Sequence, residues 1–336
     1  MAITTDQSDS AYQAALQGVV FFDIRDGGVL RVEGPDQLAF LQRQTTNDVD
    51  LLSPSRSLVT VLVNPAARIL DVLRLCQEGS GIDVLTLPGY AASTARFLKS
   101  RIFFMDKVSL QDLSQEYAQI ELDGPNAGAL LRKLGFEHAP ELDEVILARF
   151  NEAQIRAIGR RGLIGKGYLL LAHAEQAQAL QAALRAHQAE ELSSEIYQIL
   201  RLEAGLPGAG AELNEQYTPL EAGLAWTVAA DKGCYTGQEI IARQVTYDKI
   251  TQHLVGLHLE AAIPPGERLW AEGKPVGTAT SVVASPTFGQ IALAIVRRPY
   301  HAPGTTLTAS AEPGDPGLRA RVVTLPFRQQ APKEPA

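Results

Sequence analysis

The residues best suited to chemistry lie in one short segment, Lys232–Glu239, which reads Lys-Gly-Cys-Tyr-Thr-Gly-Gln-Glu and is named the octet. Cys234, one of only two cysteines in the chain, stands there between two glycines. These glycines allow tight or left-handed backbone, so the backbone can approach a ligand closely. Apolar residues at helical spacing predict a helix from Gln238. The first amides of that helix, together with the charge of Lys232, would favour the thiolate of Cys234.

The octet is equally compatible with an inert thiol buried in a glycine-bounded turn. A disulfide between Cys76 and Cys234 is possible in principle. However, the chain begins without the basic start and apolar stretch of a secretory signal, so we expect a cytoplasmic location, where disulfides are rare. Two cysteines are too few for a four-thiolate iron–sulfur site, and no short Cys/His spacing indicates zinc, so we expect no metal site.

Composition narrows the function classes. The chain has 336 residues, 46% of them hydrophobic and 20% charged, which is typical of a globular protein with two or three domains. No apolar stretch is long enough to cross a bilayer. The formal net charge of -8 argues against nucleic acid as a direct ligand, although a local basic pocket for an anionic small molecule remains compatible with it.

Short strands mixed with helices before residue 250 predict an α+β fold. From His253 onward, short β-rich runs alternate with turns, which predicts a small antiparallel β-barrel or sandwich and a domain boundary near Ile250. The predicted strands are Val19–Phe22, Val29–Val32, Leu58–Val63, Ile69–Leu75, Ile82–Leu87, Ile120–Leu122, Ile155–Ile158 and Tyr168–Leu171. The predicted helices include Tyr90–Ile102, Asn126–Leu134, residues 174–187 and Ser193–Ala204.

Several phrases occur in order along most of the chain. Together they resemble the folate-binding family that contains the glycine-cleavage aminomethyltransferase (T-protein) and its YgfZ-type relatives. The phrases are Val32-Glu33-Gly34-Pro35-Asp36, Thr46-Asn47-Asp48, Arg201-Leu202-Glu203-Ala204-Gly205-Leu206-Pro207, Glu212-Leu213-Asn214-Glu215, Thr218-Pro219-Leu220-Glu221-Ala222-Gly223-Leu224, Trp226-Thr227-Val228 with the octet, Val276-Gly277-Thr278-Ala279-Thr280-Ser281, Ser285-Pro286-Thr287 and Leu325-Pro326-Phe327.

The octet also bears on the branch of the family. Its Cys-Tyr-x-Gly-Gln-Glu form resembles the YgfZ-type branch, whereas aminomethyltransferases tend to have a non-cysteine residue in place of Cys234 and an arginine in place of Gln238. The phrase at Thr218–Leu224 looks closer to the transferase. Asp71 is followed by Val72, where transferases usually carry two successive acids. The missing acid weakens the case for aminomethyl transfer without removing folate binding.

The resemblance implies duplicated α+β lobes that form a central channel for tetrahydrofolate or a one-carbon-substituted folate, with a small antiparallel β-barrel beside them. We expect the two-lobed folate-binding domain over residues 12–250 and the barrel over 251–328. Residues 1–11 and 329–336 are expected to be flexible tails.

The resemblance also implies roles for particular residues. Glu203 matches the acid that binds the pterin, and its alternative is a solvated helix acid. Tyr235 and Trp226 could wall the p-aminobenzoyl ring, although a core position is the more natural interpretation of Trp226. For the glutamate tail, Arg243 and Lys249 are candidates by position, and a solvated helix face explains either equally well.

Within the octet, Lys232 and Gln238 would belong to the folate site, with Cys234 as the working thiol. Asp71 matches an acid near the reacting centre of the transferase, and a lone acid at a strand end could as well cap a turn.

Three functions follow as hypotheses, and the sequence leaves open whether the chain is an enzyme. The favoured one is a YgfZ-type, tetrahydrofolate-dependent protein that supports the assembly or repair of iron–sulfur proteins through Cys234. The second is an aminomethyltransferase that takes a one-carbon unit from a lipoyl carrier protein, with Asp71 as its acid. The third is a non-catalytic folate-binding scaffold in which Cys234 is structural.

Overall fold

The computed structural model describes residues 5–312 and 317–328, and the chain divides into two compact units. The first unit holds Met1–Ile196 and Trp226–Ile240, and the second holds Tyr197–Ala225 and Ile241–Ala336. Each unit is thus built from two separate segments of the chain. The single domain boundary near Ile250 stays a prediction.

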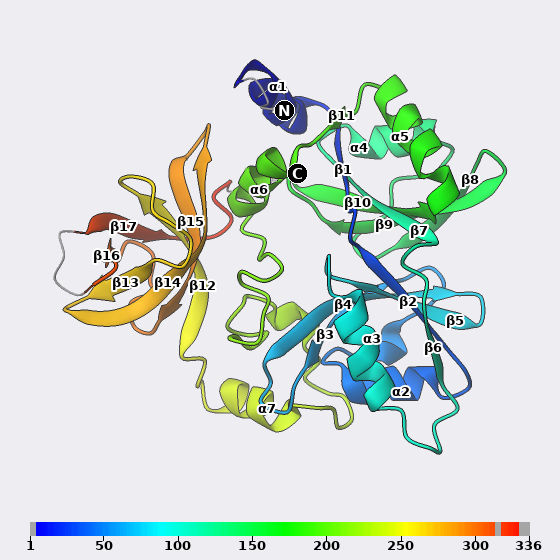
Figure 1. Ribbon diagram of the computed structural model, residues 1–336, viewed down its shortest axis with the longest axis horizontal. Coiled ribbons are helices and arrows are strands. Elements are labelled where there is room, and N and C mark those ends of the chain that lie inside the picture. The colour runs from blue at the N-terminus through cyan, green and yellow to red at the C-terminus, as the bar shows by residue number, and fades with distance from the viewer. Residues whose placement is uncertain (1–4, 313–316, 329–336) are drawn as a thin grey trace, which may run out of the picture. The chain divides into compact units, whose positions relative to one another are not determined.

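The first unit contains a six-stranded sheet in the order β11-β1-β7-β10-β9-β8 (Figure 1). One face packs against helices α4 (Ala127–Lys133) and α5 (Ala177–Ala186), whose Leu130 and Leu184 share a buried core with Phe21 of the sheet. The short 3₁₀ helix η2 (Ala174–Gln176) leads into α5. The strands are β1 (Val20–Asp23), β7 (Tyr117–Asp123), β8 (Val145–Phe150), β9 (Ala153–Arg161), β10 (Lys166–His173) and β11 (Glu190–Glu191).

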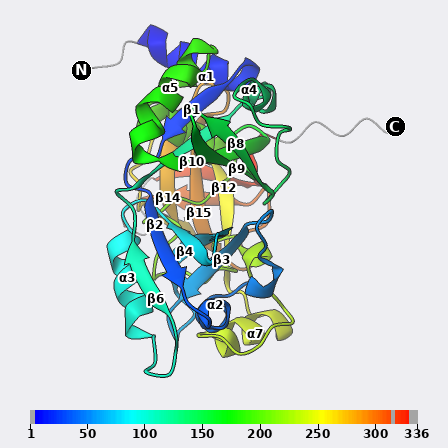
Figure 2. The same ribbon diagram turned by 90° about the vertical axis from the view of Figure 1, so that its right-hand side faces the viewer.

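A second sheet of the same unit has five strands in the order β3-β4-β5-β2-β6. Helices α2 (Gln37–Gln44) and α3 (Ala91–Ser100) cover one of its faces (Figures 1 and 2), and Phe40 and Leu98 contribute to the buried core between helices and sheet. The 3₁₀ helix η1 (Val49–Leu51) follows α2. The strands are β2 (Gly28–Glu33), β3 (Leu58–Val63), β4 (Ile69–Glu78), β5 (Gly81–Thr86) and β6 (Ser109–Asp112).

The two sheets repeat one design. Each contains a strand, β7 or β2, that enters a helix through a Gly-Pro turn. The chain then continues into a three-stranded meander whose last strand returns to pair with that strand. The glycines of the two turns, Gly34 and Gly124, have φ values of +118° and +110°, which residues with a side chain adopt only under strain. The predicted duplication of α+β lobes is confirmed.

The uncovered face of the second sheet packs on the first sheet. Val29 and Cys76 share an apolar cluster with Ile158 of β9. A buried ion pair lies beside this cluster, because Arg156 Nη2 approaches Asp83 Oδ2 to 2.6 Å. The two sheets of the first unit therefore form one continuous packed body.

Helix α1 (Thr5–Gln17) begins within residues 1–11, which we expected to be a flexible tail, and continues into the predicted domain. Tyr12 and Ala15 on this helix are buried, as is Ala11, the last residue of the predicted tail, and the extent of that tail stays a prediction. Residues 1–4 and 329–336 of the predicted tails lie outside the described residues.

The second unit contains a closed six-stranded barrel in the order β12-β15-β14-β13-β16-β17, as predicted (Figure 1). Leu257, Ala294 and Val322 are among the buried side chains that fill it. The unit also holds most of helix α6 (Ser194–Glu203) and the later part of α7 (Gln238–Thr246). The strands are β12 (Gln252–Leu259), β13 (Arg268–Ala271), β14 (Lys274–Ser285), β15 (Gly289–Arg297), β16 (Thr306–Ala309) and β17 (Leu318–Val323).

Candidate functional site

The octet is fixed at its start by Lys232. The Nζ atom of this lysine donates hydrogen bonds to the carbonyl oxygens of Thr45, at 2.7 Å, and of Asn47, at 2.6 Å, just after helix α2. Burial lowers the pKa of Lys232 to about 8, although Asp48 and Asp50 act in the opposite direction. The lysine therefore anchors the loop, and the effect of its charge on the thiol of Cys234 stays a prediction.

Tyr235 provides a second anchor. Its side chain is buried, and the ammonium of Lys232 lies 5.1 Å from the centre of its ring, within the range of a cation–π interaction. Burial raises the pKa of the Tyr235 phenol to about 12, so the ring stays neutral at physiological pH. We expected Tyr235 to wall a ligand, and the structure shows it packed into the loop that carries Cys234.

The end of the octet docks on the turn between β3 and β4. Gly237 has a φ of +80°, and a Cβ added there would lie 3.0 Å from the carbonyl oxygen of Asn64 and 3.1 Å from Cα of Ala67. Thr236 donates its backbone N–H to the carbonyl of Arg43 at 3.2 Å. The second glycine of the octet is thus required by a close backbone approach.

Gln238 closes the loop on itself. Its Nε2 donates to the carbonyl of Lys232 at 3.5 Å, and helix α7 begins at this residue as predicted. This bond makes Gln238 a part of the loop's own framework, and its predicted contact with a folate remains untested.

Between these anchors, Cys234 is exposed, whereas Cys76 is buried in β4, and both are free thiols. Burial raises the pKa of the Cys76 thiol to about 12, which makes that cysteine inert at neutral pH. The buried turn that we considered for Cys234 is wrong. The loop buries its tyrosine, partly buries its lysine and leaves its thiol exposed.

Asp71 lies inside β4, where we had expected a strand end, and is fully buried. Its Oδ2 accepts from Thr94 Oγ1 at 2.5 Å, and its Oδ1 accepts from the backbone N–H groups of Leu87 and Val72 at 3.1 and 2.8 Å. Burial raises the pKa of Asp71 to about 7 despite these bonds. The carboxyl group therefore ties β4 to helix α3 and to the end of β5.

Trp226 is 39% exposed, so the core interpretation of this residue is wrong. The guanidinium carbon of Arg161, at the end of β9, lies 4.4 Å from the centre of the indole ring. This pair places a cation over a partly exposed indole ring within the first unit.

Glu203, at the end of α6 in the second unit, is fully buried. Its Oε1 accepts from Ser285 Oγ at 2.5 Å, and its Oε2 accepts from Nε and Nη2 of Arg328 at 2.9 and 2.7 Å. The backbone N–H of Phe327 donates to the carbonyl of Glu203 at 2.9 Å. Glu203 therefore clamps the segment after β17, and the solvated helix acid that we considered as its alternative is wrong.

Arg243 is exposed on α7, and Lys249 is exposed shortly after that helix. The Lys249 ammonium lies 5.4 Å from the ring of Tyr247. Of the predicted site residues, the structure brings together Lys232, Tyr235 and Gln238 around Cys234. Arg243 and Glu203 belong to the second unit.

Family models match two parts of the chain. Residues 4–232 match the GCVT N-terminal domain, and residues 252–328 match the glycine cleavage T-protein C-terminal barrel domain. The chain belongs to the GCVT family.

Named relatives agree with this family. The chain is 32% identical over 326 residues to an aminomethyltransferase of Geobacillus kaustophilus, with 92% of this chain and 87% of the relative covered. It is 31% identical over 316 residues to a chloroplastic protein of Arabidopsis thaliana that has the provisional name of a transferase, with 91% and 72% covered. Because that GCVT-family relative is chloroplastic, the cytoplasmic location stays a prediction.

A solved structure supports the fold. The glycine cleavage system aminomethyltransferase T of Bartonella henselae superposes with a TM-score of 0.84 at 24% identity, covering 96% of this chain and 89% of that one. At that identity the match establishes the GCVT-type architecture of lobes and barrel. Within the described residues, no helix is long and apolar enough to cross a membrane.

Sequence reasoning missed two parts of the candidate site. The carbonyl groups that hold Lys232 belong to a backbone segment, although the Thr46-Asn47-Asp48 phrase of the GCVT family marked its position. No feature of the sequence placed Arg161 in the site, because its partner Trp226 is distant in the sequence and the two residues meet only in the folded protein.

Proposed function

We propose that this GCVT-family protein binds a reduced folate and uses Cys234 as an exposed thiol that supports the assembly or repair of iron–sulfur proteins. The observation that carries the proposal is the contrast within the octet, where Lys232 and Tyr235 are anchored and Cys234 is exposed. A thiol that only filled space would be expected in the interior, as Cys76 is.

An exposed thiol on an anchored loop suits a reaction with a macromolecular partner. The anchors fix the backbone on both sides of Cys234, so little conformational entropy is lost when a client protein approaches. One cysteine cannot hold a cluster, and within the described residues no group of three His, Cys, Asp or Glu side chains could hold a metal ion. Cys234 would therefore act on a cluster protein by direct contact, and the cluster would remain the client's own.

The residues present fit one half of a folate. The flat p-aminobenzoyl ring could stack on the accessible indole of Trp226, and the nearby Arg161 guanidinium could pair with the glutamate carboxylates. Glu203 does not fit the pterin, because its carboxylate is fully buried and already accepts from Ser285 and Arg328. We assign the p-aminobenzoylglutamate half to Trp226 and Arg161 and assign no residue to the pterin.

Aminomethyl transfer is the second candidate, because several relatives at 29–32% identity are named aminomethyltransferases. Its predicted acid would be Asp71. That carboxyl group is inaccessible and accepts three hydrogen bonds from its own lobe. Folate-dependent release of ammonia from an aminomethylated lipoyl carrier protein would establish this activity, and loss of that release in Asp71→Asn would assign the acid.

A non-catalytic folate-binding scaffold is the third candidate, and it predicts that Cys234 can be replaced without consequence. The test that separates it from our proposal uses cells that lack this protein and express Cys234→Ala or the wild type. We expect Cys234→Ala to accumulate normally and to leave iron–sulfur enzyme activity at the level of the deletion strain. Full restoration of that activity by Cys234→Ala would rule out a working thiol.

A further inference from the structure

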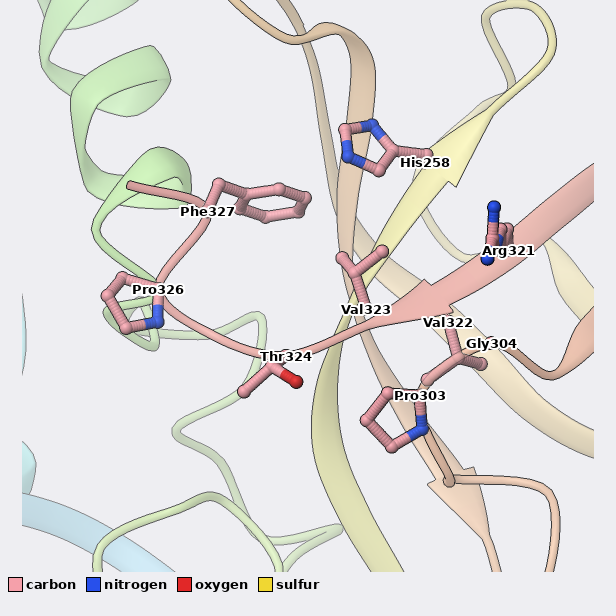
Figure 3. A pocket seen from close by; sticks show the side chains of 9 residues that line it. All are labelled: His258, Pro303, Gly304, Arg321, Val322, Val323, Thr324, Pro326 and Phe327. Carbon is pink, nitrogen blue, oxygen red and sulfur yellow. The ribbon is translucent and has the colours of Figure 1, made fainter. Parts of the chain in front are cut away.

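We propose that the outer surface of the barrel carries a binding site for a small aromatic carboxylate, separate from the octet and from the folate contacts proposed for Trp226 and Arg161. The site is a cavity of about 350 Å³ formed by β12, the turn before β16, and the end of β17 with the segment that follows it (Figure 3). Its lining residues are His258, Pro303, Gly304, Arg321, Val322, Val323, Thr324, Pro326 and Phe327.

The charge of the cavity selects an anion. Arg321 of β17 and His258 of β12 are directly opposed in the antiparallel ladder, so their side chains emerge on the same face of the sheet. The cavity lining contains no carboxylate, and within the described chain Arg321 forms no ion pair. A guanidinium with open donors and two parallel N–H directions is well suited to bind a carboxylate in bidentate fashion.

The rest of the lining combines apolar side chains, among them Val323 and Pro303, with the hydroxyl group of Thr324 and the rings of His258 and Phe327. Figure 3 shows the rings of Phe327 and His258 on one side of Val323 and Pro303 on the other. The two rings meet edge to face, with centroids 5.6 Å apart and an interplanar angle of 79°. An aromatic ligand could add a further edge-to-face or offset contact to Phe327.

Phe327 is a fixed wall, because it is 9% exposed and its backbone N–H donates to the carbonyl of Glu203 at 2.9 Å. The preformed wall lowers the entropic cost of binding. A volume of about 350 Å³ lies at the lower end of the range for small-molecule sites, which limits the ligand to about one ring with its charged group.

Benzoate is the probe for this site, titrated by calorimetry into the wild-type protein and three variants. Arg321→Gln removes the cation of the cavity. Arg319→Gln is the matched control, because Arg319 is exposed two residues earlier on the same face of β17 and does not line the cavity. Phe327→Leu keeps an apolar wall and removes its ring.

We expect benzoate to bind the wild type with a Kd of about 1 mM or tighter, and Arg321→Gln to weaken binding about tenfold. Arg319→Gln should stay within about twofold of the wild type. Acetate, which lacks the ring, and benzamide, which lacks the charge, should each bind about tenfold more weakly than benzoate. Phe327→Leu should weaken benzoate and leave acetate unchanged.

Equal benzoate affinity in Arg321→Gln and the wild type would overturn the proposal, as would equal affinity for benzamide and benzoate. Absence of benzoate binding at about 10 mM would overturn it as well. Circular dichroism of each variant would show that the barrel remains folded, so that loss of binding is not loss of structure.

Discussion

The ammonium nitrogen of Lys232 lies 2.7 Å from the carbonyl oxygen of Thr45, which secures the octet to the end of helix α2. Together with the bond to Asn47, this contact uses the lysine to satisfy two backbone acceptors. The lysine beside Cys234 is thus primarily an anchor of the loop, and it leaves the thiol exposed.

Lys232→Met, which keeps the length of the side chain and removes its donors, should lower the free energy of unfolding by about 1–2 kcal/mol. The reason is that the carbonyls of Thr45 and Asn47 lose their charged partner. Urea denaturation measures the change, and Lys99→Met on the exposed surface of α3 is the control, expected within about 0.5 kcal/mol of the wild type. Equal stability of both variants would contradict the anchoring role.

The lowered pKa of Lys232 makes its contribution to stability depend on pH. Its folded pKa of about 8 is below the ordinary value of 10.5, so between these pH values the unfolded chain binds more protons at this site. The contribution of Lys232 to stability should therefore rise as the pH increases from about 8 to about 10.5. The difference in unfolding free energy between wild type and Lys232→Met should grow over this range, and a constant difference would contradict it.

The raised pKa of Asp71 predicts a pH dependence of stability that is opposite in sign to that of Lys232. Burial raises its folded pKa from 3.8 to about 7, so the folded protein binds the extra proton between these values. Its contribution to stability should fall with increasing pH across that range, by at most about 1.4 kcal/mol per pH unit. Asp71→Asn can still accept from Leu87 and Val72 and should remove this slope. Urea denaturation at several pH values measures it, and parallel wild-type and variant curves would refute the assignment.

The ion pair between Glu203 and Arg328 predicts which of two substitutions lowers the stability of the protein more. The Glu203 side chain is 0% exposed and that of Arg328 is 27% exposed. Arg328→Met would leave a buried carboxylate without its cation and should cost about 3–5 kcal/mol. Glu203→Gln would leave a partly solvated guanidinium and should cost less. Thermal unfolding of both variants measures the order, with Arg319→Gln as the surface control, and the reverse order would contradict this account of the clamp.

Tetrahydrofolate binding tests the contacts proposed for Trp226 and Arg161. Trp226→Ala and Arg161→Gln should each weaken binding about tenfold in a calorimetric titration, through loss of stacking and of the cation. Arg96→Gln, at an exposed position of α3, should bind as the wild type does. Binding that is unchanged in both test variants would place the folate elsewhere, and a wild type that does not bind would remove folate from the proposed function.

The sequence predicted those parts of the fold that depend on local pattern. Alternating β-rich runs and turns after His253 predicted a small antiparallel barrel or sandwich, of which the family resemblance favoured the barrel that the structure shows. The apolar spacing after Gly237 predicted the start of α7. Sheet membership was not predictable in this way. Val20 pairs with Asp123 of the first sheet, whereas Val29, a few residues later, pairs with Leu85 of the second. That choice depends on strands far away in the sequence.

The candidate site likewise combines features that follow from local sequence with features that depend on distant segments. The residue types of the octet indicated tight or left-handed backbone at its glycines, which the structure shows at Gly237. The anchoring of the loop by Lys232 was not predicted. The exposure of Cys234 and the burial of Asp71 could not be predicted, because each is decided by segments distant in the sequence.

The central claim is that the octet holds a reactive thiol in solvent, and alkylation of the native protein tests it most directly. Iodoacetamide would be added at neutral pH, and mass spectrometry would follow the peptides of Cys234 and Cys76 in the same sample. We predict that Cys234 reacts at least as fast as a cysteine in an unstructured peptide of the same sequence, while Cys76 reacts only as the protein unfolds. Protection of Cys234 to the level of Cys76 would contradict the account.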